Sequence, residues 1–262
     1  MPRFSAHLSF LWQELPFLER FTAAKAAGFP AVECAVPEAP AAEARRRADE
    51  LGLAFIGINT SFGEQYGGRA GLAALPGLES GFAADLGTAL DYAAAVGARH
   101  IHVLSGVVEG IAPQEAEATF LRNMETAIRM AESAGVMLLI EALNSRDRPG
   151  YFLSRSQEAF GLAERFASPH LKVMFDTYHT QIMEGDIVAR LEANLDRIGH
   201  IQVSGVPGRS EPDHGELDHR WVFAAIDRLG WSGYVGCEYR PLTTTKAGLG
   251  WMRTLTGAPA RS

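Results

Sequence analysis

The chain has 262 residues, with 24 Lys and Arg against 31 Asp and Glu, which gives a net charge of −7. A composition of 47% hydrophobic and 21% charged residues is that of an ordinary globular protein and excludes disordered, collagen-like and disulfide-scaffold proteins. The acidic balance also argues against a nucleic-acid-binding protein, which normally presents a basic surface.

Strand-like and helix-like segments alternate along the chain. In chain order, the predicted strands and the helices that follow them are 4–11 and 15–27, 31–34 and 40–51, 53–59 and 80–96, 98–104 and 113–133, 136–141 and 154–167, 171–176 and 184–197, 198–204 and 219–229, and 233–238 and 245–256. Most of these helices are predicted to end at a glycine, at Gly28, Gly52, Gly97, Gly135, Gly199 and Gly230. Pro169 is predicted to stop the helix before the sixth strand.

The alternation predicts a (β/α)8 TIM barrel. Residues 136–140 form a continuous apolar run, which suits a parallel strand buried on both faces. Eight strand–helix units in a chain of this length match the barrel in number and size. A doubly wound open sheet is less well supported, because no glycine-rich nucleotide motif follows the first strand. No linker-like tract divides the chain, so we expect a single barrel domain over 1–262.

The sequence also predicts where the protein acts. Cys34 and Cys237 have no nearby cysteine partner, which argues against a zinc ribbon or a secreted disulfide framework. The N-terminal residues do not resemble a signal peptide, and no apolar segment approaches the ~20 residues that a membrane span needs. We therefore expect a cytoplasmic protein with neither a membrane nor a nucleic-acid partner.

Active sites of TIM barrels form at the carboxyl ends of the strands. Polar residues stand where each predicted strand stops, namely His7, Glu33, Asn59, His102, Glu141, Asp176, Gln202 and Glu238. The last four come from consecutive strands and are expected around one rim. Three carboxylates and an amide form an all-oxygen set that suits Mg²⁺ or Mn²⁺, and without a cation the carboxylates would repel one another. A structural carboxylate paired with a neighbouring arginine is the alternative for any single member.

Further polar residues complete a predicted substrate pocket. His179 is expected on the loop after the sixth strand, and Arg209 lies on a Gly- and Pro-rich loop after the seventh, where it is suited to bind a substrate carboxylate. His7 and His102 are also candidate substrate contacts. Of His100 and His102, only His102 is predicted to face the barrel interior. The other histidines are interpreted as structural or exposed.

Several local motifs resemble the hydroxypyruvate isomerase family, within the xylose isomerase-like barrels. They are LPFL at 15–18, GLAALPG at 71–77, NSRDRPGY at 144–151, YHTQIMEGD at 178–186, PGRSEP at 207–212 and CEYRP at 237–241. The resemblance covers nearly the whole chain. The sequence departs from the family's usual forms at His7, at 34–37 and at 59–63, at the ends of the first three strands. Because these positions help to shape the pocket, the resemblance indicates the chemistry more securely than the substrate.

The resemblance implies a metal-dependent isomerase. It implies that Glu141, Asp176, Gln202 and Glu238 hold one divalent ion, Mg²⁺ or Mn²⁺. Glu141 and Glu238 would also be the acid–base pair that moves a proton between adjacent carbons. By analogy with related ketose epimerases, His179 and Arg209 would contact substrate oxygens. Relatives are usually homo-oligomers.

We therefore predict an aldose–ketose isomerase of a small hydroxy-oxo acid that acts through a cis-enediolate. Conversion of hydroxypyruvate to tartronate semialdehyde fits this reaction. A 2-oxo- or 3-oxo-tetronate isomerase and a ketose 3-epimerase are alternatives with the same mechanism. A metal-dependent abasic-site endonuclease is a remote alternative, because it needs a multi-zinc cluster and a basic DNA-facing surface. A non-catalytic sugar-acid binder is disfavoured by the presence of both glutamates.

Overall fold

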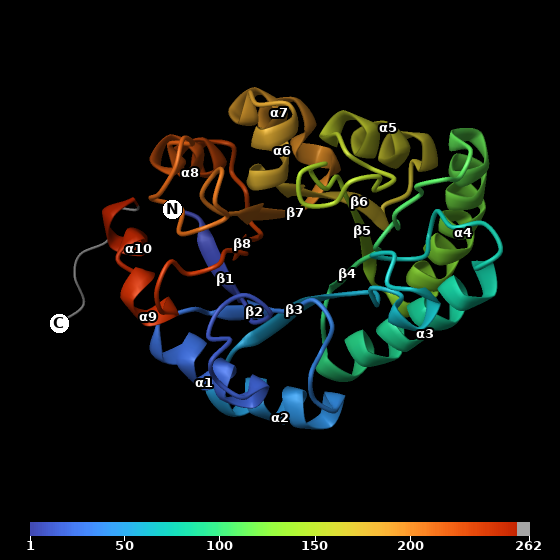
Figure 1. The fold of residues 1–262 in the computed structure, drawn as a ribbon. Coiled ribbons are helices and arrows are strands. Elements are labelled where there is room, and N and C mark those ends of the chain that lie inside the picture. The colour runs from blue at the N-terminus through green and yellow to red at the C-terminus, as the bar shows by residue number, and fades with distance from the viewer. Residues whose placement is uncertain (256–262) are drawn as a thin grey trace.

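A computed structural model describes residues 1–255, and residues 256–262 of the predicted domain lie outside the described part of the chain. Eight parallel strands form a closed barrel in which each strand pairs with the next and β8 pairs with β1 (Figure 1). The strands are β1 (Arg3–His7), β2 (Ala31–Glu33), β3 (Ala54–Asn59), β4 (His100–His102), β5 (Met137–Glu141), β6 (Leu171–Asp176), β7 (Ile198–Val203) and β8 (Tyr234–Cys237). The predicted TIM barrel is confirmed.

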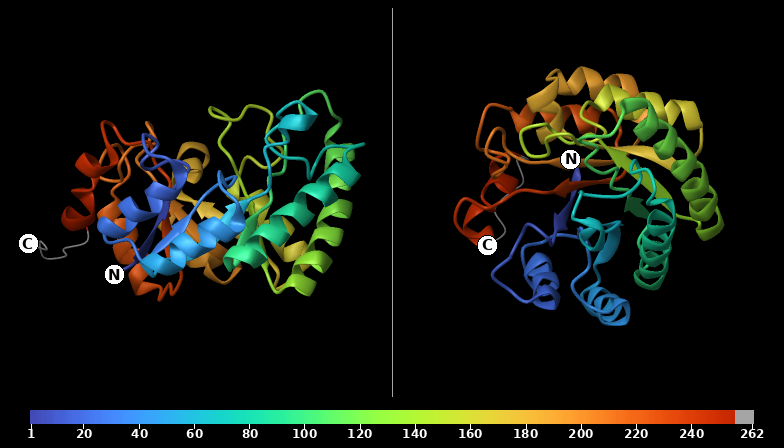
Figure 2. Two further views of the ribbon diagram at one scale, coloured as in Figure 1. Left: turned by 90° about the horizontal axis from the view of Figure 1, so that it is seen from below. Right: turned by 45° about the vertical axis from the view of Figure 1, so that its right-hand side comes forward.

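Helices surround the barrel, as two turned views show (Figure 2). They are α1 (Phe17–Ala26), α2 (Ala41–Leu51), α3 (Glu79–Val96), α4 (Pro113–Ala134), α5 (Ser156–Phe166), α6 (Thr177–Met183), α7 (Ile187–Asn194), α8 (His219–Arg228), α9 (Thr245–Gly248) and α10 (Trp251–Thr254), with short 3-10 helices at Glu64–Tyr66 and Leu195–Arg197. The helix predicted over 245–256 is two short helices, and residue 256 lies outside the described residues.

The predicted helix ends are partly confirmed. Gly97 and Gly135 adopt the left-handed conformation directly after α3 and α4, with φ of 77° and 66°. Gly199 does not end a helix but lies within β7, where a Cβ atom would come within 2.5 Å of Leu139. Its role is to permit close packing inside the barrel. Helix α5, which precedes β6, ends at Phe166, and its C-cap Ala167 has a left-handed φ of 48°, so the helix stops before it reaches Pro169.

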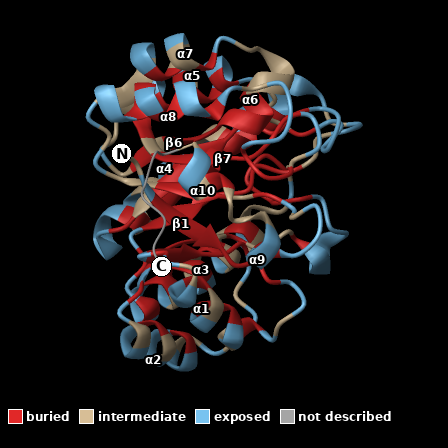
Figure 3. Ribbon diagram, turned by 90° about the vertical axis from the view of Figure 1, so that its left-hand side faces the viewer, coloured by how far each residue is buried: buried red, intermediate tan, exposed pale blue. Residues whose placement is uncertain are grey.

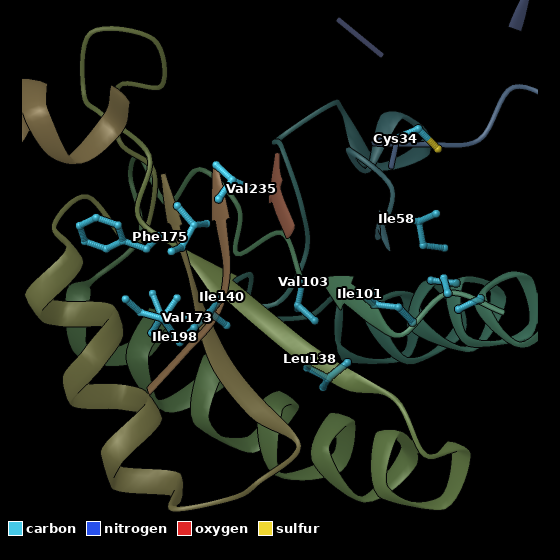
Figure 4. Packing of buried hydrophobic residues seen from close by; sticks show 14 of the residues in the cluster. Cys34, Ile58, Ile101, Val103, Leu138, Ile140, Val173, Phe175, Ile198 and Val235 are labelled. Atoms are coloured by element: carbon cyan, nitrogen blue, oxygen red, sulfur yellow. The ribbon is translucent and has the colours of Figure 1, made fainter. Parts of the chain in front are cut away.

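Two layers of different chemistry lie on the two sides of the barrel wall. Outward-facing aliphatic side chains pack against the helices in one continuous cluster that includes Ile101, Ile140 and Val173 (Figure 4). The strands are almost wholly buried, whereas the outer faces of the helices are exposed (Figure 3). The inward side is largely polar, because the alternation of the strands directs residues such as Glu33 and Glu141 toward the barrel axis.

Strand β4 corrects one prediction. His100 and His102 are both buried in the barrel interior, since residues two apart in a strand lie on the same face. The His100 ring packs against that of His200, with 4.8 Å between ring centroids, while His102 Nδ1 lies 3.5 Å from Glu141 Oε2. The interpretation that only His102 faces inward was therefore wrong. The two residues occupy successive layers along the barrel axis.

Within residues 1–255, no helix is both long enough and apolar enough to cross a bilayer.

Candidate active site

The polar strand ends open into one cavity of about 480 Å³ at the carboxyl end of the barrel. Most of the predicted site residues line it, namely His7, His102, Glu141, His179, Gln202, Arg209 and Glu238, together with Asn59 from the third strand. Asp176 is buried beside them, and its Cα is paired in register with that of Gln202. Glu33 does not line the cavity but lies deeper in the barrel.

Three of the four predicted metal ligands present unsatisfied oxygens. Glu141 Oε1, Asp176 Oδ2 and Gln202 Oε1 are buried and accept no hydrogen bond. Buried polar atoms without a partner are uncommon and destabilising, so three oxygens at one end of the barrel suit the binding of a cation. Ligand atoms of Glu141, Asp176 and His179 also lie within 4.8 Å of one another, in an arrangement able to hold a metal ion. The oxygen donors of Glu141, Asp176 and Gln202 fit a hard divalent cation.

Arg209 is the cationic counterpart of these carboxylates. Its Nη2 lies 3.0 Å from Glu238 Oε2 and 3.5 Å from Asp176 Oδ2, the longer contact being an ion pair rather than a hydrogen bond. The guanidinium carbon lies 4.8 Å from the centre of the Phe10 ring and 5.1 Å from that of Tyr178, which adds cation–π contacts. Arg209 has a left-handed φ of 53°, unusual for a residue with a side chain and frequent at functional sites.

Burial and mutual repulsion perturb the carboxyl groups. Burial, followed by the charges of Asp176 and Glu238, raises the pKa of Glu141 well above its usual range. Burial raises the pKa of Asp176 to about 7, although the charge of Arg209 opposes the rise. Burial also raises the pKa of Glu238, again against Arg209. Raised pKa values of this kind are frequent among side chains that take up and release protons at functional sites.

His179 lies on α6, not on a loop as predicted, because Asp176 caps a helix that begins directly after β6 by accepting from the N–H of Tyr178 at 2.7 Å. The backbone N–H of Asn144 donates to His179 Nδ1 at 3.0 Å. Burial lowers the pKa of His179 well below its usual range, so the ring is neutral. A neutral ring that accepts at Nδ1 carries its proton on Nε2, which lies 3.7 Å from Asp176 Oδ2.

Two further histidines flank the acidic groups. His7 Nε2 lies 3.8 Å from Glu238 Oε1, and His102 Nδ1 lies 3.5 Å from Glu141 Oε2. Burial lowers the pKa of His7 to about 4 and that of His102 to about 3, so both rings are neutral at physiological pH. His7 Nδ1 and His102 Nε2 are buried without a hydrogen-bond partner. Each ring therefore has one nitrogen that forms no hydrogen bond within residues 1–255.

The sequence indicated Glu33 as a strand-end residue but not its partners. Glu33 accepts hydrogen bonds from Ser5, His200 and Gln202 in the barrel interior. Burial raises the pKa of Glu33, but the charge and hydrogen bond of His200 and further donors outweigh it, so the pKa falls well below its usual range. Glu33 is thus an ionised carboxylate beneath the site. Phe10, which stacks on Arg209, carried no signal in the sequence.

Comparison with known proteins agrees with this geometry. A sequence profile described as xylose isomerase-like TIM barrel matches residues 21–255. The chain is 46% identical to a 2-oxo-tetronate isomerase of Cupriavidus necator, over 98% of this chain and 100% of that protein. It is 36% identical to the hydroxypyruvate isomerase of Escherichia coli K12, over 96% of this chain and 98% of that protein. The resemblance stated from the motifs is confirmed, and both of these relatives are named as isomerases.

One solved structure carries a different name. A crystal structure described as an AP endonuclease of family 2 from Brucella melitensis has a TM-score of 0.94 and 39% identity to this chain. The match covers 97% of this chain and 99% of the other. Relatives of this chain are therefore named both as isomerases and as an endonuclease, so the activity has to be argued from the side chains of the site.

Proposed function

The chain belongs to the xylose isomerase-like TIM barrel family, and from that premise we propose that it is a metal-dependent isomerase of short hydroxy-oxo acids. The identity to the Cupriavidus relative makes a four-carbon 2-oxo-tetronate the first substrate to test, with three-carbon hydroxypyruvate as the second. The observation that carries the proposal is the gathering of Glu141, Asp176 and Glu238 with Arg209 at one cavity.

We propose Mg²⁺ or Mn²⁺ as the cofactor, held by Glu141, Asp176, Gln202 and Glu238. When bound, the ion supplies Lewis-acid stabilisation of negative charge on the oxygens of the substrate. The unsatisfied oxygens of Glu141, Asp176 and Gln202 support this assignment. The carboxyl groups lose their repulsion once a cation lies among them, because the positive charge favours their ionised forms.

Glu141 and Glu238 form the proposed acid–base pair. One carboxylate removes the proton from the hydroxyl-bearing carbon next to the substrate carbonyl, which gives an enediolate. The other carboxyl group delivers a proton to the former carbonyl carbon, and the hydroxyl proton passes to the former carbonyl oxygen, so the carbonyl moves by one position and the composition of the acid is unchanged. Proton exchange with water returns the two carboxyl groups to their starting states. Proton transfer by positioned groups typically contributes ~10²–10⁴-fold to the rate. Burial raises the pKa of both groups, a direction that is frequent among acid–base residues.

The remaining residues of the cavity are proposed to orient the acid. Arg209 presents a planar guanidinium that can bind the substrate carboxylate through two parallel hydrogen bonds. The Nε2–H of His179 can donate to a substrate oxygen, since its Nδ1 is occupied by the backbone of Asn144. His7 and His102 add polar atoms on the walls next to Glu238 and Glu141.

Location of deuterium tests this function directly. The enzyme loaded with Mg²⁺ or Mn²⁺ is incubated in D₂O with hydroxypyruvate, with both oxo-tetronates and with neutral ketoses. Isomerisation places deuterium on the former carbonyl carbon and moves the carbonyl group. Deuterium at the original carbon with inverted configuration would instead indicate an epimerase. Tight binding of an acid with no exchange would indicate a non-catalytic binder and would contradict the proposal.

Metal affinity should increase with pH. Because Asp176 has its pKa raised to about 7, the metal-free protein keeps a proton there below that pH, and an arriving ion must displace it. The stability of the metal-free fold has the opposite pH dependence: the contribution from the raised pKa of Asp176 is present at low pH and is lost as the pH rises through about 7. We expect Mn²⁺ affinity to rise up to about tenfold per pH unit for each displaced proton between about pH 5.5 and 7, then level off. Titration calorimetry in several buffers measures this, and a pH-independent affinity would contradict it.

The endonuclease alternative is favoured only by the name of the Brucella structure. Within residues 1–255, the groups able to hold a metal are Glu33 with His100 and His200, and Glu141 with Asp176 and His179, and only the second adjoins the cavity. The net charge of −7 also disfavours DNA binding. Cleavage of an abasic-site duplex, together with salt-dependent binding, is the result that would support this alternative.

A further inference from the structure

We propose that Glu33, which lies outside the cavity, is a positioning residue that holds the side-chain amide of Gln202 with its oxygen toward the metal site. This inference rests on the metal ligands named in the proposed function. Glu33 itself touches neither the cavity nor the substrate position. Its effect is exerted entirely through Gln202.

The contacts of Glu33 define its role. It is the last residue of β2, 2% exposed, and both of its carboxylate oxygens are engaged. Ser5 Oγ donates to Oε1 at 2.6 Å, and His200 Nε2 donates to Oε2 at 2.9 Å. Gln202 Nε2 donates to the same Oε2 at 3.2 Å. Ser5 and His200 therefore hold the carboxylate in place, and the carboxylate in turn orients Gln202.

The chemistry of the two groups fixes the direction of the amide. An ionised carboxylate only accepts hydrogen bonds, whereas a glutamine side chain has one donating and one accepting end. The NH₂ group of Gln202 must therefore face Glu33, and its Oε1 must point away. That oxygen is buried, accepts no hydrogen bond, and belongs to a side chain that lines the active-site cavity.

Close packing against β8 restricts the network on one side. Gly236 of β8 lies beside it, and a Cβ atom there would come within 2.4 Å of Glu33 Oε1 and 2.9 Å of Gln202 Cγ. Since real Cβ atoms do not approach so closely, the two side chains occupy the space that a side chain at 236 would need. On that side, the backbone of β8 therefore leaves no room for the Gln202 side chain to move away from Glu33.

Glu33, His100 and His200 also have ligand atoms within 4.8 Å of one another. A second metal ion there would have to displace the His200 hydrogen bond from a carboxylate that already accepts three donors. Positioning explains these contacts without breaking any of them. A second bound Mn²⁺ that is lost on replacement of His100 would overturn this interpretation of the cluster.

The test measures Mn²⁺ affinity by titration calorimetry and needs no substrate. Glu33→Met removes the acceptor at nearly constant volume and should weaken Mn²⁺ binding by about 10–100-fold, the usual effect of losing an outer hydrogen-bond partner of a metal ligand. Glu33→Gln should bind close to wild type, because its carbonyl can still accept from Gln202 while its NH₂ faces Ser5. Glu184→Met is the matched control, since that glutamate has a 3% exposed side chain outside the cavity.

A double-mutant cycle separates positioning from general damage. If Glu33 acts through Gln202, then Gln202→Met should weaken Mn²⁺ binding and the further change Glu33→Met should add nothing. A melting curve of each metal-free variant reports its folding. If Glu33→Met does not fold, Glu33→Asp takes its place, because it keeps the charge but withdraws the acceptor from Gln202, and it too should weaken Mn²⁺ binding.

Wild-type Mn²⁺ affinity in folded Glu33→Met or Glu33→Asp would overturn the inference, as would full additivity in the cycle or a wild-type protein that binds no Mn²⁺. The proposed function fails differently. A protein that binds Mn²⁺ and shows the cycle, but exchanges no substrate proton, would support the role of Glu33 and contradict the isomerase activity.

Discussion

Replacing either Glu141 or Glu238 with glutamine is expected to lower kcat by about 10²–10⁴-fold, the usual contribution of a positioned acid–base group. Both side chains line the cavity, and burial raises the pKa of both. Glutamine keeps the size and hydrogen-bonding capacity of each side chain but cannot take up or release a proton in this role. The loss therefore falls on proton transfer rather than on folding.

Deuterium exchange sharpens the measurement. Each variant should lose exchange of the substrate proton with D₂O together with turnover, while its melting temperature stays near that of the wild type. Glu184→Gln is the matched control, because its carboxylate pairs with Arg190 outside the cavity and its loss should leave kcat unchanged. Wild-type turnover in Glu141→Gln or Glu238→Gln would remove that residue from the acid–base pair.

Arg209→Met is expected to lower kcat/KM for the acid by about 10²–10³-fold, within the 2–5 kcal/mol that truncating a buried, hydrogen-bonded charge typically costs. Two effects combine. The substrate carboxylate loses its proposed partner, and Glu238 and Asp176 lose the cation that now lies 3.0 and 3.5 Å from them. Without it the pKa values of both carboxyl groups should rise further, since Arg209 opposes that rise.

Comparison of substrates separates these effects. If Arg209 binds the substrate carboxylate, the loss should be larger for an oxo-acid than for any neutral ketose that the enzyme accepts. Arg209→Lys should recover only part of the activity, because a lysine keeps the charge but not the paired hydrogen bonds. Arg146→Met, which changes an exposed arginine outside the cavity, should behave as wild type. An equal loss for acids and ketoses would argue against carboxylate recognition.

The barrel was predictable because local signals repeat. The apolar run of β5, the glycines after α3 and α4 and the near-equal spacing of the units each follow from neighbouring residues. The incorrect predictions concern positions whose structure is determined by tertiary packing. Gly199 resembles a helix terminator but serves the close packing of β7, and the helix that holds His179 begins within a motif interpreted as a loop.

The candidate site was predictable in its members but not in its contacts. Strand-end positions bring Glu141, Asp176, Gln202 and Glu238 to one end of the barrel because parallel strands share that end. The partner of Gln202 is another matter. Its hydrogen bond to Glu33 joins residues 169 positions apart across the barrel, and no local pattern specifies such a pair. This contact follows from closure of the barrel, which allows inward-facing side chains of β2 and β7 to meet in the interior.

The acidic groups and the arginine of this site come from different kinds of structure. The carboxyl groups stand at or directly after strand ends, whereas Arg209 lies on the connection between β7 and α8 with a left-handed backbone. Doubling the length of such a connection costs only about 0.6 kcal/mol of chain entropy, while moving a strand end disturbs the whole barrel. If Arg209 binds the substrate carboxylate as proposed, remodelling its loop changes the acid that is recognised while the strand ends that carry the carboxyl groups stay in place.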